Sequence, residues 1–125
     1  MLIAEVSEKY DISPETIRYY ERIGLIPRVH RNQSGIRDFT EKDCGWVEFI
    51  KCLRSAGLPI ELLIEYVSLF QQGDEETMET RKAILAEQRE MLKKKIDELT
   101  ATLERLDYKI SIFDQRIVAH EKTLR

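Results

Sequence analysis

Five arginines lie within 20 residues near the start of this 125-residue chain: Arg18, Arg22, Arg28, Arg31 and Arg37. Only Glu15 and Glu21 oppose them between residues 13 and 37. Guanidinium groups form paired hydrogen bonds with phosphate oxygens, so this cluster indicates binding to a nucleic-acid backbone. The chain as a whole has a net charge of −3, which makes the positive charge a local feature. For any one arginine the alternative is a solvated surface position, and the density of the cluster favours binding.

Three further side chains suited to nucleic acid share the first part of this stretch: Thr16, Tyr19 and Tyr20. Arg18 and Arg22 are four residues apart, so on a helix they lie on one face. Tyrosine rings can pack inward while their hydroxyls bond a phosphate or a base edge. For any one of these residues, the alternative to DNA binding is an ordinary structural position: the surface for an arginine and the core for a tyrosine.

Two short helices joined by a tight turn must position these side chains. Residues 2–10 carry apolar side chains at helical spacing, and a second helix is predicted from about residue 14 to residue 23. Ser13 has the character of an N-cap, Pro14 suits the first helical position and Gly24 suits the stop. The pair is predicted to be a helix-turn-helix, whose capped second helix offers free backbone N–H groups to phosphate.

Residues 25–39 break the helical period and are predicted to form a β-hairpin wing. A four-residue loop containing Ser34 and Gly35 separates its two extended runs. Arg28, Arg31 and Arg37 flank the wing, where they could hold the DNA backbone or enter a minor groove.

Two more helices are predicted after the wing. Thr40 and Asp43 indicate a capping box at the start of residues 40–57, which end at Gly57. Its core face is predicted from a helical wheel to hold five side chains: Trp46, Phe49, Ile50, Leu53 and Ala56. The next helix starts after Pro59 and ends at Gly73.

The last helix is predicted to run from a cap at Asp74 to the end of the chain, with no Gly or Pro after residue 74. Its apolar side chains alternate three and four apart, as in a coiled-coil seam: Leu92, Ile96, Leu99, Leu103, Leu106, Ile110, Phe113 and Ile117. A seam this long exceeds what its own small domain could cover, so we expect a homodimer. Its composition favours a parallel pair.

The predicted fold is therefore all-α with a small β wing. Residues 1–73 are expected to form a winged helix-turn-helix domain with two following helices, and residues 74–125 a dimerisation helix. No apolar run is long enough for a membrane span and no signal peptide is evident, so a cytoplasmic location is expected. No arrangement of nucleophile, base and acid is recognisable, and we expect no enzyme.

The segments "TIRYYERIGLIP" and "SGIRDFTEKD", followed by a long coiled coil, resemble the MerR family of bacterial transcription regulators. The resemblance covers nearly the whole chain. It implies an antiparallel homodimer, which replaces the parallel pair expected from composition. It also implies binding to a promoter with a long spacer, which is bent and untwisted so that RNA polymerase can engage it. Arg18, Tyr19 and Tyr20 would belong to the recognition helix, and Arg31 and Arg37 to the wing contacts. Ile36 stands where many relatives have Tyr.

Metal-sensing relatives carry cysteines at the start of the dimer helix and in a C-terminal loop. Here residues 74–80 read "DEETMET" and no cysteine follows Cys52. His30 and His120 are isolated. Drug-sensing relatives add a sizeable C-terminal domain, whereas this chain ends with its coiled coil. Metal sensing and drug sensing are therefore both disfavoured, and we expect no metal and no cofactor.

Two thiols remain, Cys44 and Cys52, too far apart on one helix to form a disulfide. Cys44 falls on the predicted polar side and is expected to be exposed and incidental. Cys52 lies at the edge of the apolar stripe, where an adduct would disturb packing. The segment "WVEFIKCLRSAGLPIELLIEY" is similar to the NmlR/AdhR-like branch, which responds to aldehydes and other electrophiles, and this implies that Cys52 is the sensor.

From the residues alone, a small buried hydrophobe is the favoured interpretation of Cys52, and only the resemblance reverses this preference. A cysteine near a helix C-terminus meets the negative end of the helix dipole, so thiolate formation needs a cation from another element. Two functions compete with an effector-controlled regulator: an excisionase-like architectural protein that bends DNA without sensing anything, and an interaction module that recruits a partner through its coiled coil.

Overall fold

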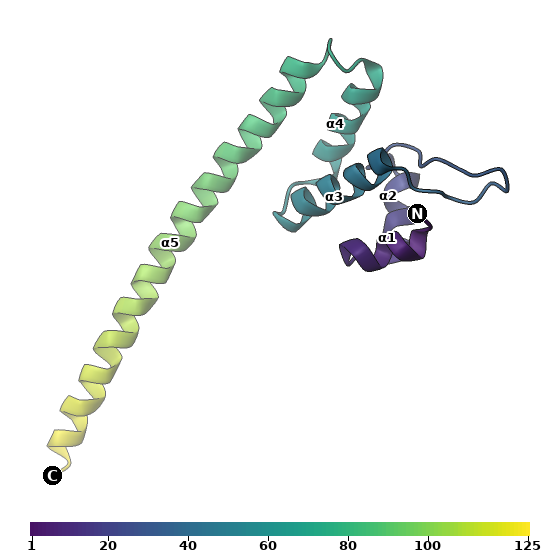
Figure 1. Ribbon diagram of the computed structural model, residues 1–125. Helices are drawn as coiled ribbons and strands as arrows, with labels where there is room; N and C mark the ends of the chain where they lie inside the picture. The colour runs from purple at the N-terminus through teal and green to yellow at the C-terminus, as the bar shows by residue number, and fades with distance from the viewer. The chain divides into compact units, whose positions relative to one another are not determined.

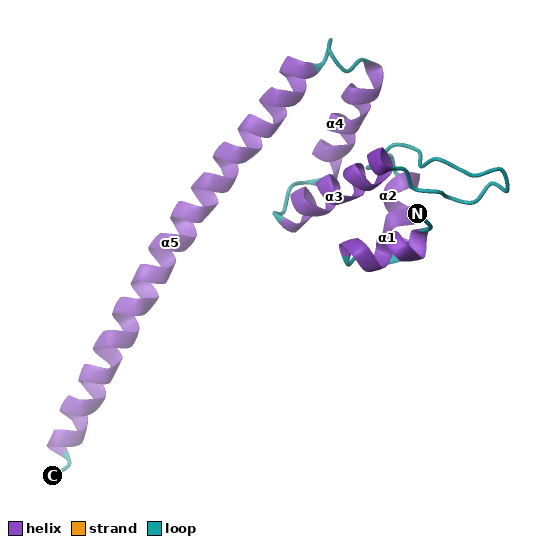
Figure 2. Cartoon of the chain, in the orientation of Figure 1, coloured by secondary structure: helices purple, strands orange, loops and turns teal.

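The computed structural model describes residues 1–125 and contains five helices and no extended strand (Figure 1, Figure 2). The helices are α1 (Ile3–Tyr10), α2 (Pro14–Arg22), α3 (Glu41–Ser55), α4 (Ile60–Gln72) and α5 (Met78–Thr123). The chain divides into two compact units, Met1–Leu85 and Ala86–Arg125. The all-α class with a small wing is confirmed. The predicted domain boundary at residues 73 and 74 stays a prediction. None of the helices has the length and apolar character that crossing a membrane requires.

Helices α1 and α2 form the predicted helix-turn-helix, and local sequence signals set the limits of α2. The Ser13 hydroxyl accepts a hydrogen bond from the Thr16 backbone N–H at 3.1 Å, which caps the helix. Gly24 follows the last turn with a φ of +81°, a conformation that glycine adopts without strain. Val6 of α1 and Ile17 of α2 are fully buried in the core of the first unit.

The wing is much shorter than the predicted β-hairpin. The chain reverses between residues 29 and 39, and its two arms share a single isolated antiparallel bridge between Arg31 and Arg37. Backbone hydrogen bonds on either side of this bridge join Asn32 to Ile36 at 2.9 Å and Asp38 to His30 at 2.8 Å. The wing is therefore a loop with a narrow base.

Helix α3 packs on two sides, which the single apolar stripe of the helical wheel did not predict. Thr40 and Asp43 form the expected capping box. Three side chains of α3 are buried in the core of the first unit: Cys44, Val47 and Ile50. Of these, only Ile50 was predicted to be buried. Trp46 and Phe49 are only half-buried and contact aromatic rings of α4, and Ala56 is exposed. The prediction for Ala56 is therefore wrong.

Helix α5 begins at Met78, three residues later than predicted, because Asp74 does not cap it. A turn occupies residues 74–77, and the Asp74 carboxylate pairs with Arg81 at 2.8 Å. The Thr77 hydroxyl instead lies at the end of α4, within hydrogen-bond distance of the carbonyl oxygens of Leu69 (2.9 Å) and Gly73 (2.6 Å), to which it donates its one hydrogen. The intervening turn thus ties the start of α5 to α4.

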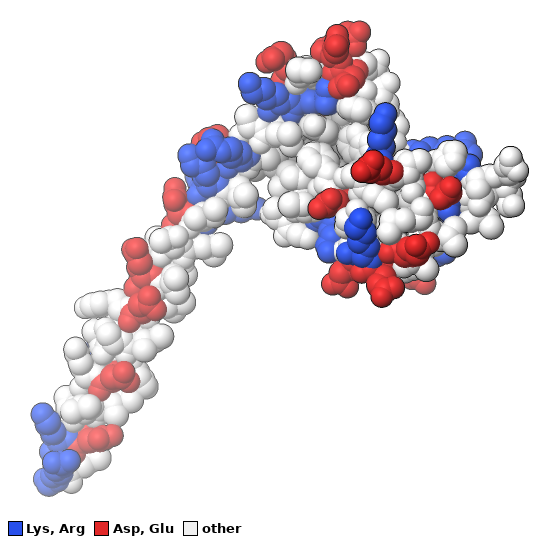
Figure 3. All heavy atoms as spheres, viewed as in Figure 1, with Lys and Arg blue, Asp and Glu red and all other residues white.

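The second unit, Ala86–Arg125, is a single helical stretch whose large apolar side chains are exposed. The predicted seam residues are exposed along its whole length: Leu92, Ile96, Leu99, Leu103, Leu106, Ile110, Phe113 and Ile117. On the face drawn in Figure 3, broad uncharged surface separates isolated charged groups along this stretch. Such a row of apolar side chains is unusual on a helix that faces water on all sides.

Candidate nucleic-acid interface

Arginines from α2 and from the wing surround one carboxylate, that of Glu21. They line a surface hollow of about 470 Å³: Arg18, Arg22, Arg28, Arg31 and Arg37, with Glu21 among them. The structure therefore brings together the arginines that the sequence analysis singled out, although they come from two different elements. A concave surface lined by guanidinium groups is suited to phosphate oxygens.

Glu21 makes three hydrogen bonds at the base of the wing. Its Oε2 accepts from the backbone N–H of Val29 at 2.6 Å. Its Oε1 accepts from Arg37 Nε at 2.7 Å and from Arg31 Nη2 at 3.2 Å. Since the Glu21 side chain is only 8% exposed, these contacts are largely shielded from water. One carboxylate thus connects the second helix to both arms of the wing.

Side chains of α2 divide between the core, the cap and the surface. Arg18 and Arg22 are exposed, and the guanidinium of Arg22 lies 5.4 Å from the ring centre of Tyr19. Tyr20 is half-buried against the core. The Thr16 hydroxyl lies 2.7 Å from that of Ser13, so the Thr16 side chain takes part in the N-cap of α2.

The wing tip is held by the side chain of Asn32. Its Oδ1 accepts from the backbone N–H groups of Ser34 at 2.9 Å and Ile36 at 3.1 Å. Gly35 completes the reversal with a φ of +79°. Ser34, Gly35 and Ile36 are exposed at this tip, and Arg28 is exposed at the other end of the wing.

Sequence reasoning missed two residues that shape this interface, Glu21 and Asn32. In sequence Glu21 is only a charge opposing the arginines, yet a lone acidic residue within a basic stretch was the available signal. Asn32 is in sequence only part of a loop, although an Asn side chain commonly accepts from the backbone two residues further on in a turn. Both residues hold the wing through hydrogen bonds to its backbone, and Glu21 also through its arginines.

The structure buries Cys44 and exposes Cys52. Cys44 is buried, with 7% of its surface exposed, and its sulfur lies 3.9 Å from that of Met1. The prediction that Cys44 is exposed is therefore wrong, and its cause is the second packed side of α3. Cys52 is exposed.

The cations beside Cys52 are directed at backbone carbonyls. Lys51 Nζ donates to the carbonyl of Tyr10, and Arg54 Nη1 donates to that of Leu58 at 2.7 Å. Neither cation is therefore committed to the thiol. His30 and His120 are exposed, and no group of three or more His, Cys, Asp or Glu side chains is arranged to hold a metal ion.

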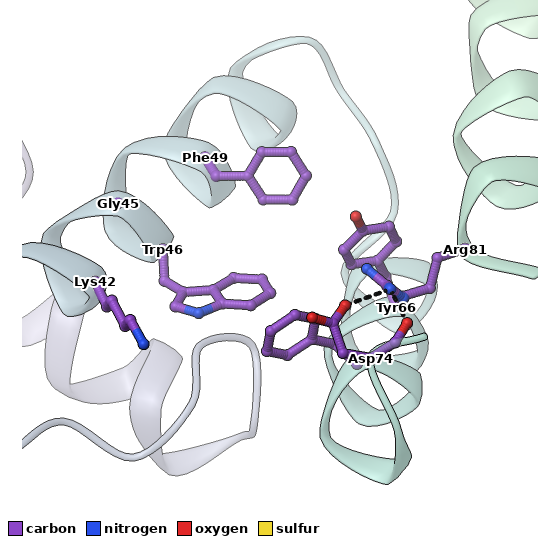
Figure 4. A pocket seen from close by; sticks show the side chains of 8 residues that line it. Lys42, Gly45, Trp46, Phe49, Tyr66, Asp74 and Arg81 are labelled. Atoms are coloured by element: carbon purple, nitrogen blue, oxygen red, sulfur yellow. Dashed lines mark hydrogen bonds and ion pairs between the residues drawn. The ribbon is translucent and has the colours of Figure 1, made fainter. Parts of the chain in front are cut away.

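A second hollow, of about 590 Å³, lies where α3, α4 and the first turn of α5 meet (Figure 4). Trp46 and Phe49 line it from α3. The Trp46 and Phe70 rings pack edge to face, with 5.1 Å between their ring centres. The guanidinium of Arg81 lies 5.2 Å from the ring centre of Phe70 and 5.7 Å from that of Tyr66. Arg81 Nε also donates to the Thr77 hydroxyl at 3.0 Å. Arg81 therefore fastens the start of α5 to α4.

Replacing Arg81 by Ala should lower the free energy of unfolding by about 2 kcal/mol, because the stacking and the hydrogen bonds of a largely buried guanidinium are removed together. Urea unfolding at one fixed protein concentration measures the change. Arg89→Ala is the matched control. Arg89 pairs with Glu90 at 3.2 Å, but both side chains are mostly exposed, so the change should be below about 0.5 kcal/mol. Equal effects of the two substitutions would contradict the anchoring role of Arg81.

A capped helix with exposed arginines, followed by a wing whose arginines share its surface, defines a helix-turn-helix DNA-binding protein. Residues 1–69 match the family described as MerR HTH family regulatory protein, and residues 45–108 match the family described as MerR, DNA binding. The chain belongs to the MerR family. This is a family of DNA-binding transcription regulators and not of enzymes.

Several individual proteins are similar to the chain. The HTH-type transcriptional regulator AdhR of Bacillus subtilis is 56% identical over 92 residues, which span 74% of this chain and 65% of AdhR, just under two thirds. A putative MerR family regulator from Listeria monocytogenes has a TM-score of 0.90 and 47% identity, covering 99% of this chain and 93% of that one. HiNmlR, a MerR family regulator lacking the sensor domain and bound to promoter DNA, has a TM-score of 0.81 and 32% identity, covering 91% of this chain and 90% of that one.

Proposed function

We propose that the protein is a homodimeric regulator that binds a promoter with a long spacer and distorts it, so that RNA polymerase can engage both promoter elements. The observation that carries this proposal is the arginine-lined hollow shared by α2 and the wing. The hollow presents guanidinium groups from two elements of the protein to the DNA backbone. A protein that distorts DNA needs such contacts from more than one element. The crystal structure of HiNmlR on promoter DNA adds support, since its fold is similar.

The exposed seam of α5 supports the dimer. From Leu92 to Ile117, eight large apolar side chains recur at intervals of three and four residues, and each is at least 37% exposed. Burying such a row against a second copy removes apolar surface from water, which is the main driving force for association. Two copies also provide two recognition helices, which suit the two half-sites of a symmetric operator. We expect the pair to be antiparallel and to work in the cytoplasm.

We propose that the effector is an aldehyde or a related electrophile and that it acts at Cys52. Support comes from the exposure of this thiol and from the similarity to AdhR. A thiol adds to an aldehyde without any oxidant. The sulfur–carbon bond forms, the carbonyl π bond opens, and the thiol proton ends on the oxygen, which leaves a hemithioacetal.

Transcription in vitro from a long-spacer promoter, with and without formaldehyde, tests this assignment. Cys52→Ala should bind promoter DNA as the unaltered protein does, yet lose the increase in transcript on addition of aldehyde. Cys44→Ala should keep that increase, since Cys44 is largely buried, with 7% of its surface exposed, and is not the proposed sensor. If Cys52→Ala retains induction, the sensor assignment is wrong. If aldehyde never changes transcription but the protein still bends the DNA, the architectural function is the better description.

A further inference from the structure

The Glu21 carboxylate lies at the base of the wing, whose two arms are joined by a single bridge and not by a β-sheet. Arg31 and Arg37 face each other across the only bridge in the wing, so two like charges are directly opposed. Opposed like charges repel and weaken such a pair. Glu21 contacts both guanidinium groups through the same oxygen, at 3.2 Å and 2.7 Å. It offsets their repulsion and supplies contacts that a longer ladder of backbone hydrogen bonds would otherwise provide.

The contacts of Glu21 also set the direction of the arginines. Arg37 donates through Nε, which leaves both of its terminal nitrogens free of Glu21. Arg31 donates through one terminal nitrogen, and its own Nε is buried without a partner. The third contact, from the Val29 backbone N–H, fixes the segment that leads from α2 into the wing.

We propose that Glu21 is a positioning residue for DNA recognition: it holds Arg31 and Arg37 and the base of the wing against α2, so that recognition helix and wing meet the duplex in one fixed geometry. This inference rests on the proposed DNA-binding function and deepens it. It assigns a role in sequence discrimination to a negatively charged residue that does not itself suit contact with phosphate.

Simple electrostatics and the positioning role predict opposite changes in the affinity of Glu21→Gln for the specific site. Removing a negative charge beside the DNA surface strengthens phosphate binding to every duplex. Gln keeps the shape of Glu, but its amide NH₂ replaces one acceptor oxygen and then faces N–H donors of Val29 or the arginines. Under the positioning role, affinity for the specific site falls about tenfold while affinity for unrelated DNA stays the same or rises.

The experiment uses the full-length protein and two probes of equal length. One is a duplex selected from a random-sequence pool by the unaltered protein, and the other is a scrambled duplex of the same composition. Fluorescence anisotropy at several salt concentrations gives the ratio of the two affinities for each variant. Glu48→Gln is the control, since it removes the same charge from an exposed position on α3, outside the arginine hollow, and should leave the ratio unchanged.

Two further variants separate positioning from loss of fold. Glu21→Asp keeps the charge but shortens the side chain, so it should also lower the ratio. In an Arg31→Ala, Arg37→Ala background, Glu21→Gln should have a much smaller further effect on the ratio, because only the contact with the Val29 N–H remains to be lost. Thermal unfolding shows whether each variant is folded under the binding conditions. A ratio that is the same for Glu21→Gln and for the unaltered protein overturns the inference, whereas failure of the unaltered protein to select any duplex overturns the proposed function.

Discussion

Leu103→Asp is expected to separate the protein into monomers and to weaken its binding to the selected duplex by more than about 100-fold. Leu103 lies in the middle of the exposed seam and is 59% exposed in the single chain. In a dimer, a carboxylate at this position would be buried among apolar side chains from both copies, which is strongly unfavourable. Loss of the dimer then removes the gain in affinity that comes from engaging two half-sites together, which is typically about 10²–10⁴.

Ala101→Asp provides the matched control for this prediction. It introduces the same carboxylate two residues away, on the opposite side of the helix from Leu99 and Leu103, and Ala101 is exposed. Sedimentation equilibrium measures the oligomeric state of both variants, and anisotropy measures their DNA binding. If Leu103→Asp remains dimeric at the concentrations at which the unaltered protein is dimeric, the seam is not the dimer interface.

Arg18→Ala should produce the second large effect, a loss of binding to the selected duplex of about 100-fold. One arginine contact with DNA typically contributes about 1–3 kcal/mol to the binding free energy, and the substitution removes this contact at both half-sites of a dimer. Arg18 is exposed on α2 and lines the arginine hollow, so its replacement should leave the core undisturbed.

The dependence of affinity on salt distinguishes direct phosphate binding from a general charge effect. If Arg18 binds phosphate, the slope of log affinity against log salt should become shallower by about one unit for each phosphate that is no longer neutralised. Arg116→Ala removes the same charge from an exposed position in the second unit and should change neither affinity nor slope appreciably. Unchanged affinity of Arg18→Ala at every salt concentration would show that α2 is not the recognition helix.

The helix limits could be predicted well where they depend on local chemistry. Ser13 and Thr40 cap their helices because a hydroxyl reaches a backbone N–H three residues later, and this requires no knowledge of the rest of the fold. Gly24 and Gly57 have the positive φ angles that end a helix. The limit at Asp74 was wrong because a more distant partner, Arg81, takes its carboxylate.

Burial on α3 could not be predicted from one helical wheel. The wheel assumes one buried stripe, whereas α3 contacts the helix-turn-helix core with one side and the aromatic rings of α4 with another. The result is that Cys44 is buried and Ala56 exposed, the reverse of the expectation. The arginines of the candidate site were found because their density is visible in sequence. Glu21 was not recognised as their common partner, because Arg31 and Arg37 lie 10 and 16 residues away.

Because one thiol is buried and the other exposed, their rates of reaction with a thiol reagent can be used to measure local opening of the core. A bulky aqueous thiol reagent reaches the exposed Cys52 directly, whereas Cys44 is only 7% exposed and reacts with a reagent of that size when the structure beside Met1 opens. The slow labelling of Cys44 therefore measures the free energy of local opening, while Cys52 in the same molecule calibrates the reagent. If DNA binds at α2 and the wing, as proposed, the change in Cys44 protection on adding DNA shows how far DNA binding stiffens the core of the first unit.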